Sequence, residues 1–181
     1  MRRQIEHVDT DASGVVHFSR HVSLMETAAL DLLDEHGAGL MALAEHGVGL
    51  AVTEMRARYH RPCGYRDTVF GEPVVEHAGG AAFRTRVTLF RLEPDGLRID
   101  LSTGHLVFAA VDLGSGRARP LPPAARHTLK GLIAHADLHP ETREPDARGI
   151  VPAAQDAGLL RAQTVAAAPA PDDLPRPDPR P

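Results

Sequence analysis

The sequence SRHVSLMETAALDLLDEH, residues 19–36, contains the pattern of one long helix in a chain of 181 residues. Apolar residues recur there at intervals of three, four or seven, as on a buried helical face: Val22, Met25, Ala29, Leu32 and Leu33. Two beginnings fit the pattern, Ser19 as N-cap or Ser23 with Glu26 as a capping box. Gly37 predicts where the helix ends.

The segments around this helix alternate apolar and polar residues, which is typical of strands. These segments are residues 4–8, 48–59, 67–77, 83–89 and 99–111. Pro73 weakens the third of them, because proline has no N–H to donate to a neighbouring strand. Residues 122–135 predict a closing helix. Strands grouped apart from a single long helix predict an α+β fold, an antiparallel sheet wrapped around that helix.

Composition divides the chain into two parts. All seven aromatic residues lie between Phe18 and Phe108, whereas nine of the fifteen prolines lie between Pro140 and Pro181. A segment without aromatics and rich in Pro and Ala cannot bury enough apolar surface to fold on its own. We therefore expect one folded domain over residues 1–138 and a disordered tail over residues 139–181.

Charge and apolar content exclude several classes of protein. The formal net charge of −4 argues against a general nucleic-acid binder, whose surface would be basic. No apolar stretch approaches the roughly 20 residues of a membrane span, and acidic residues follow Arg2 and Arg3 where a signal peptide needs an apolar segment. The single cysteine, Cys63, is expected to be a passive small residue. These features predict a cytoplasmic protein that acts without nucleic acid or membrane.

The stretch that precedes the helix carries the candidate chemistry: Asp9-Thr10-Asp11-Ala12-Ser13-Gly14-Val15-Val16-His17-Phe18. A carboxylate can act as a general base or nucleophile. A glycine lets the backbone approach a ligand closely. Free N–H groups at a helix start can hold a developing oxyanion. These parts suffice for acyl transfer without a metal, although the same spacing also occurs in plain turns.

This stretch resembles the signature of the 4-hydroxybenzoyl-CoA thioesterase family of hotdog-fold acyl-CoA thioesterases, in which Asp-x-Asp-x-x-Gly-Val-Val enters a helix carrying a Glu, here Glu26. Residues 59–62, Tyr-His-Arg-Pro, resemble the family's Tyr-x-x-Pro and are followed by Asp67. Residues 119–122 resemble its closing Pro-Leu-Pro. The resemblance covers residues 3–135 and implies the hotdog fold, with its sheet wrapped around one long helix.

The resemblance also implies roles for individual residues. Asp11 matches the family's catalytic carboxylate, which either attacks the carbonyl or activates water, with Asp9 as its structural neighbour. Phe18 matches the residue whose backbone N–H polarises the thioester carbonyl. The acyl pocket would be lined by Gly14, Val15 and Val16. The implied reaction hydrolyses an acyl-CoA or acyl-carrier-protein thioester in a homodimer or dimer-based homotetramer, with no metal or cofactor.

Each of the other candidate residues has two possible interpretations. His17 is either a polar group of the site or an ordinary, partly exposed histidine. Glu26 is either a second active-site acid or a structural carboxylate. His17 and His21 have the i, i+4 spacing of metal ligands, but no third ligand follows at a recognised spacing, so no metal is predicted. Arg58 and Arg61 could bind the phosphates of coenzyme A, or form a solvated strand face.

The Tyr-x-x-Pro landmark adds Tyr59 to the candidate substrate-binding residues. Arg20 and His21 stand where relatives have Asn and Tyr, which leaves the acyl preference open. Two rival functions also remain. A hotdog dehydratase or hydratase would need a His–acid pair, for which only His17 and Asp11 are available. A non-catalytic acyl-thioester binding protein is the second, because a fold by itself does not establish activity.

Overall fold

The structure, a computed structural model, describes residues 1–138, so the predicted tail lies outside the described residues. These residues belong to one compact unit. Its elements in chain order are β1 (Arg2–Gln4), the 3-10 helix η1 (His7–Asp9), α1 (Phe18–Glu35), α2 (Leu40–Ala44), β2 (Val48–Tyr59), β3 (Thr68–Ala78), β4 (Ala82–Leu92), β5 (Arg98–Asp112) and α3 (Pro123–Leu138). Within this range, no helix is both long and apolar enough to cross a membrane.

The five strands form one antiparallel sheet in the order β1-β3-β4-β5-β2. The predicted strands are therefore present, and β2 spans the predicted residues 48–59. Pro73 lies inside β3 and pairs with Val87 of β4. It does not end the strand, because β1 pairs with β3 only at residues 68–70, so no strand of the described residues pairs with Pro73 on its other side.

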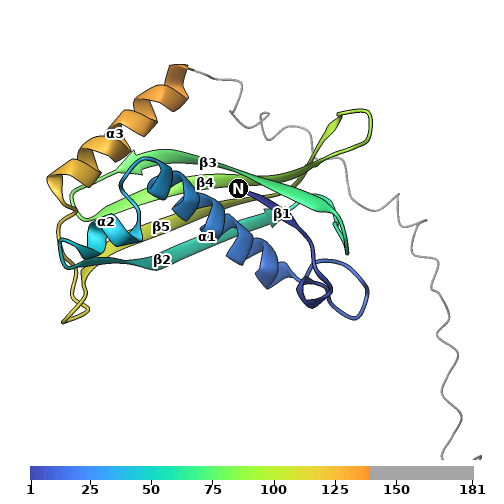
Figure 1. Cartoon of the computed structure of the whole chain (residues 1–181), viewed down its shortest axis with the longest axis horizontal. Helices are drawn as coiled ribbons and strands as arrows, with labels where there is room; N and C mark the ends of the chain where they lie inside the picture. Colours follow the sequence, from blue (N-terminus) through green and yellow to red (C-terminus); the bar gives the residue numbers. More distant parts are fainter. Residues whose placement is uncertain (139–181) are drawn as a thin grey trace, which may run out of the picture. The chain divides into compact units, whose positions relative to one another are not determined.

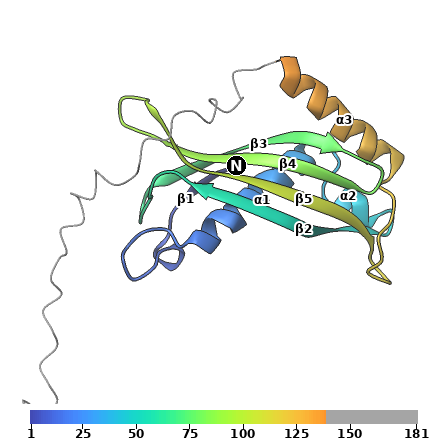
Figure 2. The ribbon, with the colours of Figure 1, turned by 180° about the vertical axis from the view of Figure 1, so that it is seen from behind.

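Helix α1 crosses one face of the sheet (Figure 1), and the view from behind shows the face that α1 leaves uncovered (Figure 2). Its buried residues are His21, Leu24, Met25, Ala28, Ala29 and Leu33. Small residues allow the close approach: a Cβ on Gly71 of β3 would lie 2.7 Å from the Ala28 Cβ, and one on Gly104 of β5 would overlap the Met25 sulfur. The prediction of an α+β fold with a sheet around one helix is confirmed.

Two local predictions need correction, and one short helix was not predicted. Helix α1 begins at Phe18, not after Ser19 or Ser23, because His17 has extended backbone angles and its ring accepts a hydrogen bond from the Ser19 N–H. Residues 4–8 are not one strand, because the chain turns into η1 where the Asp9 carboxylate accepts the Glu6 N–H. The connection after α1 contains the short helix α2, which the sequence pattern did not predict.

Candidate active site

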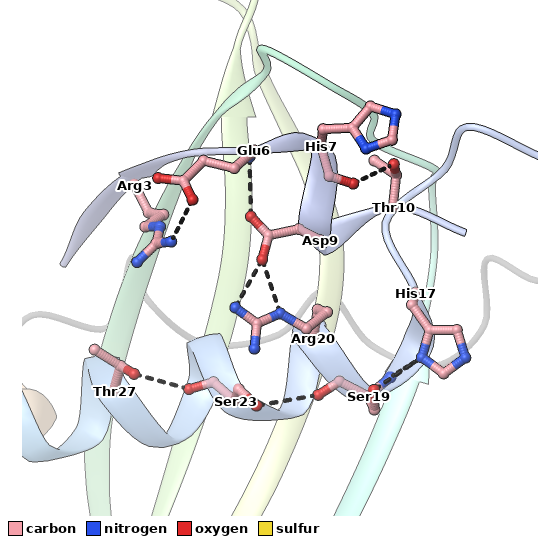
Figure 3. A network of polar contacts seen from close by, with 10 residues as sticks. All are labelled: Arg3, Glu6, His7, Asp9, Thr10, His17, Ser19, Arg20, Ser23 and Thr27. Atoms are coloured by element: carbon pink, nitrogen blue, oxygen red, sulfur yellow. Dashed lines mark hydrogen bonds and ion pairs between the residues drawn. The ribbon is translucent and has the colours of Figure 1, made fainter. Parts of the chain in front are cut away.

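Asp9 fixes the loop before α1 to the first turn of that helix (Figure 3). Its carboxylate is only 2% exposed, and its Oδ1 lies 2.8 Å from Nε and 2.7 Å from Nη2 of Arg20. Its Oδ2 accepts the Glu6 N–H at 2.9 Å. Burial raises the pKa of Asp9, but the Glu6 N–H and Arg20 outweigh that effect, so this pKa lies below its ordinary value. Asp9 is thus a buried, ionised anchor.

Backbone hydrogen bonds close the loop that carries Asp11. The Asp11 N–H donates to the Val15 carbonyl at 2.9 Å, and the His17 N–H donates to the Asp9 carbonyl at 2.9 Å. Gly14 has a φ of +81° at the tip, a conformation that favours glycine. The Val16 N–H donates to the Cys63 carbonyl, which ties the loop to the segment after β2. The loop therefore holds Asp11 at a defined place beside α1.

Asp11 is exposed, and a neighbouring serine orients its carboxylate. Oδ1 accepts the Ser13 hydroxyl at 2.5 Å and the Ser13 N–H at 2.8 Å. These two bonds stabilise the charged carboxylate and so hold the pKa of Asp11 below its ordinary value. The bond from the Ser13 hydroxyl has the larger effect, and the bond from the Ser13 N–H the next largest. The Val15 N–H also favours the charged form, so the group is ionised at neutral pH.

The first turn of α1 presents a backbone donor. The Arg20 N–H donates to the His17 carbonyl, and the Ser19 N–H donates to Nδ1 of His17 at 3.4 Å. In the part of the chain that the structure describes, the Phe18 N–H makes no hydrogen bond. An unpaired N–H at the positive end of a helix is suited to an anionic oxygen.

Asp11 and Phe18 border the same cleft, which has a volume of about 480 Å³. Seven of the predicted site residues line it: Asp11, Val15, Val16, His17, Phe18, Tyr59 and Arg61. Three predicted residues do not: Gly14 lies at the loop tip, Glu26 is exposed on α1, and Arg58 is exposed on β2. Within residues 1–138, no three His, Cys, Asp or Glu side chains gather as metal ligands.

The structure adds His21, His60 and Pro62 to the cleft. His21 is only 4% exposed, and its Nδ1 shares a hydrogen bond with the Ser102 hydroxyl at 2.9 Å. Burial lowers the pKa of His21, so its imidazole is neutral at pH 7. The sequence contained one signal for it, since position 21 lies one helical turn before Met25 of the predicted apolar face.

Cys63 completes the surroundings of His21. Its Sγ lies 4.0 Å from Nε2 of His21, and its side chain is buried. Burial raises the pKa of the Cys63 thiol to about 11, so the thiol is protonated at neutral pH. A protonated, buried thiol agrees with the passive role expected from the sequence.

Comparison with known proteins places the chain in a family. The model of the thioesterase-like superfamily matches residues 5–129. A search of curated proteins found no match. A solved structure of a hypothetical protein from Thermus thermophilus is similar, with a TM-score of 0.66 and 23% identity over 73% of this chain and 97% of that chain.

Two solved thioesterases have the same fold. One is a 1,4-dihydroxy-2-naphthoyl-CoA thioesterase from Synechocystis, with a TM-score of 0.61 and 19% identity over 76% of this chain and 96% of that chain. The other is an Asp-to-Asn variant of 4-hydroxybenzoyl-CoA thioesterase in complex with 4-hydroxybenzoyl-CoA, with a TM-score of 0.64 and 18% identity over 71% and 96%. The chain belongs to the thioesterase-like superfamily, and by that membership it is a thioester hydrolase with the hotdog fold.

Proposed function

We propose that the protein hydrolyses an acyl thioester of coenzyme A or of an acyl carrier protein, with Asp11 as nucleophile or general base. One observation carries the proposal. The ionised carboxylate of Asp11 and the unpaired N–H of Phe18 border the same cleft. A thioester carbonyl group in that cleft would have the Asp11 carboxylate, a nucleophile or base, on one side. On the other side the Phe18 N–H could donate a hydrogen bond to the carbonyl oxygen.

Two routes are compatible with this arrangement. In the first, an Asp11 oxygen attacks the carbonyl carbon, the C–S bond breaks with release of the thiolate, and water then hydrolyses the mixed anhydride. In the second, Asp11 takes a proton from a water molecule whose oxygen attacks the same carbon, and the C–S bond then breaks with release of the thiolate and the free acid. In both routes the Phe18 N–H stabilises the negative charge that develops on the carbonyl oxygen. His17 lines the cleft beside this N–H, and Glu26, outside the cleft, remains a candidate second acid.

The rest of the cleft suits an acyl group and its carrier. Val15 and Val16 give apolar surface for the acyl chain, with Gly14 at the adjoining turn. Arg58 near the end of β2 and Arg61 just after it are exposed, and within residues 1–138 neither forms an ion pair with a carboxylate. Guanidinium groups can bind phosphate in bidentate geometry. Coenzyme A and the phosphopantetheine of carrier proteins both carry phosphate groups.

The assembly that we propose is a homodimer, alone or within a tetramer. Strand β2 has twelve residues and, within residues 1–138, pairs only with β5. A long free edge with unpaired N–H and C=O groups can pair with another strand, and Val52 and Tyr59 on it are 42% and 47% exposed. A second copy joined along β2 would bring its own strand next to the cleft. Light scattering during gel filtration measures the mass directly, and a monomer would refute this part.

A thioester panel tests the activity. Acetyl-, hexanoyl-, palmitoyl- and benzoyl-CoA, and the same acyl groups on a carrier protein, are incubated with the protein while free thiol is measured with a thiol reagent. We expect release of thiol from at least one acyl group, together with the free acid. Tight binding without release would support a non-catalytic binding protein instead. Loss of a double bond or of a hydroxyl from an unsaturated or 3-hydroxyacyl-CoA, with the thioester intact, would support the hydratase alternative.

A further inference from the structure

We propose that Tyr59 is a positioning residue for the thioester reaction, supported by the buried His21–Ser102 pair and bonded to the first turn of α1. The inference rests on the proposed function and assigns a role to residues that the two routes above do not use. Its basis is a chain of contacts that runs from the interior of the sheet to the carbonyl oxygen of Phe18.

The inner end of this chain is a buried polar pair. Ser102 is fully buried on β5, and its hydroxyl shares a hydrogen bond with Nδ1 of His21 at 2.9 Å. Two polar groups removed from water in this way are costly unless they satisfy each other. The bond therefore fixes the orientation of the imidazole, and burial keeps that ring uncharged. Cys63, at 4.0 Å from Nε2, closes the opposite side of the ring.

The outer end is the phenol ring of Tyr59. It meets the His21 imidazole edge to face, at 5.3 Å between centroids and 89° between planes. Its hydroxyl donates to the Phe18 carbonyl oxygen at 3.2 Å. Tyr59 is the last residue of β2, the strand with a free edge, and is 47% exposed. The Tyr59 side chain is thus held at two points: its ring packs against the His21 imidazole, and its hydroxyl is bonded to the Phe18 carbonyl.

This contact matters because of what Phe18 does in the proposed reaction. The Phe18 carbonyl belongs to the peptide that follows the one whose N–H faces the thioester oxygen. A bond to that carbonyl limits how far the first turn of α1 can tilt or unwind, and so fixes the direction of the donor. Small misplacements of a donor reduce stabilisation of the transition state more than binding of the substrate. The expected effect of loosening Tyr59 is therefore a fall in kcat with KM nearly unchanged.

The experiment compares variants of Tyr59 and Ser102 with wild type, using whichever of acetyl-, hexanoyl-, palmitoyl- and benzoyl-CoA is hydrolysed fastest. Tyr59→Phe keeps the ring on His21 and removes only the hydroxyl. We expect kcat to fall about fivefold to tenfold, the scale of one neutral hydrogen bond, with KM within about twofold. Ser102→Ala releases His21 and should lower kcat in the same way. Because both act through one contact, the double variant should lose less than the product of the two single losses.

Two controls test whether the loss of any tyrosine hydroxyl, or of any buried hydroxyl in the sheet, changes kcat. Tyr65→Phe removes the hydroxyl of the only other tyrosine, which lies outside the cleft, and should leave kcat unchanged. Thr85→Val removes a buried hydroxyl on neighbouring β4 that has no hydrogen-bond partner within residues 1–138, and should also leave kcat unchanged. Melting temperatures are recorded for every variant. If Ser102→Ala does not fold, Tyr59→Phe decides the question alone.

The Asp11→Asn variant, measured in the same assay, separates failure of the Tyr59 role from failure of the proposed thioesterase function. If Asp11→Asn is inactive while Tyr59→Phe keeps wild-type kcat, the positioning role is refuted and the proposed function stands. If Asp11→Asn keeps the wild-type rate, the proposed function itself fails. A Tyr59→Phe variant that raises KM with kcat unchanged would make Tyr59 a simple substrate contact and would also overturn the inference.

Discussion

Replacing Arg20 by Met tests whether the Asp9 anchor holds the loop before α1. The variant keeps a side chain of similar length and removes both bonds, of 2.8 and 2.7 Å, to a carboxylate that is 2% exposed. Breaking a buried pair by removing one partner costs about 3–5 kcal/mol. The Arg20 side chain is 37% exposed, so we reduce this to about 2–3 kcal/mol. For a domain of this size, that loss lowers Tm by about 8–12 °C.

The assay is thermal unfolding followed by circular dichroism at one protein concentration, since assembly would make Tm depend on concentration. Arg84→Met is the matched control: Arg84 is 53% exposed and reaches Glu76 at 3.4 Å, so its loss should cost less than about 1 kcal/mol. Because the pKa of Asp9 is lowered in the folded state, its contribution is present above the ordinary pKa of a carboxyl and is lost as the pH falls through the folded value. The Tm gap between wild type and Arg20→Met should therefore narrow below about pH 4. A gap at pH 7 no larger than that of Arg84→Met would refute the anchor.

Three further predictions concern packing and the reactive carboxylate. Gly71→Ala should lower stability by about 1–3 kcal/mol in chemical denaturation, because its Cβ would lie 2.7 Å from the Ala28 Cβ; an unchanged midpoint would contradict this packing. Thr85→Val should raise stability by about 1 kcal/mol in the same assay, because it removes a buried hydroxyl without a partner; a loss of stability would indicate a bond that the structure does not contain. Ser13→Ala should move the acid limb of kcat/KM toward higher pH, because the Ser13 hydroxyl lowers the pKa of Asp11; an unmoved limb would mean that another group controls it.

The periodicity of the sequence was sufficient to predict the elements that carry the fold. The helical spacing from Val22 to Leu33 reflects burial of one face, which α1 packs on the sheet. The alternation from residue 48 to 59 predicted β2 correctly, although Val48 is its only buried residue. The helix start could not be predicted, because Ser19 and Ser23 are better caps by propensity than His17. The histidine cap depends on backbone angles that the closed loop imposes.

The candidate site was predictable where its residues are adjacent in the chain. Asp11 to Phe18 form one short segment, so the resemblance to a known family was sufficient to find them. His21, Ser102 and Tyr59 come from α1, β5 and β2, and they meet only through strand register and helix packing. The spacing of residues along the sequence does not predict such contacts. Glu26, by contrast, fitted the family pattern, yet it lies exposed on α1 and outside the cleft.

The most direct test of the account is the rate of thioester hydrolysis by Asp11→Asn, with the acyl-CoA that wild type hydrolyses fastest. Asp95→Asn is the control, because Asp95 is also an exposed carboxylate in a turn whose Oδ1 accepts an N–H two residues ahead. The account predicts that Asp11→Asn loses about 10²-fold or more in kcat, with Tm and acyl-CoA binding retained, and that Asp95→Asn matches wild type. An Asp11→Asn enzyme that still hydrolyses the thioester at the wild-type rate would contradict the central claim.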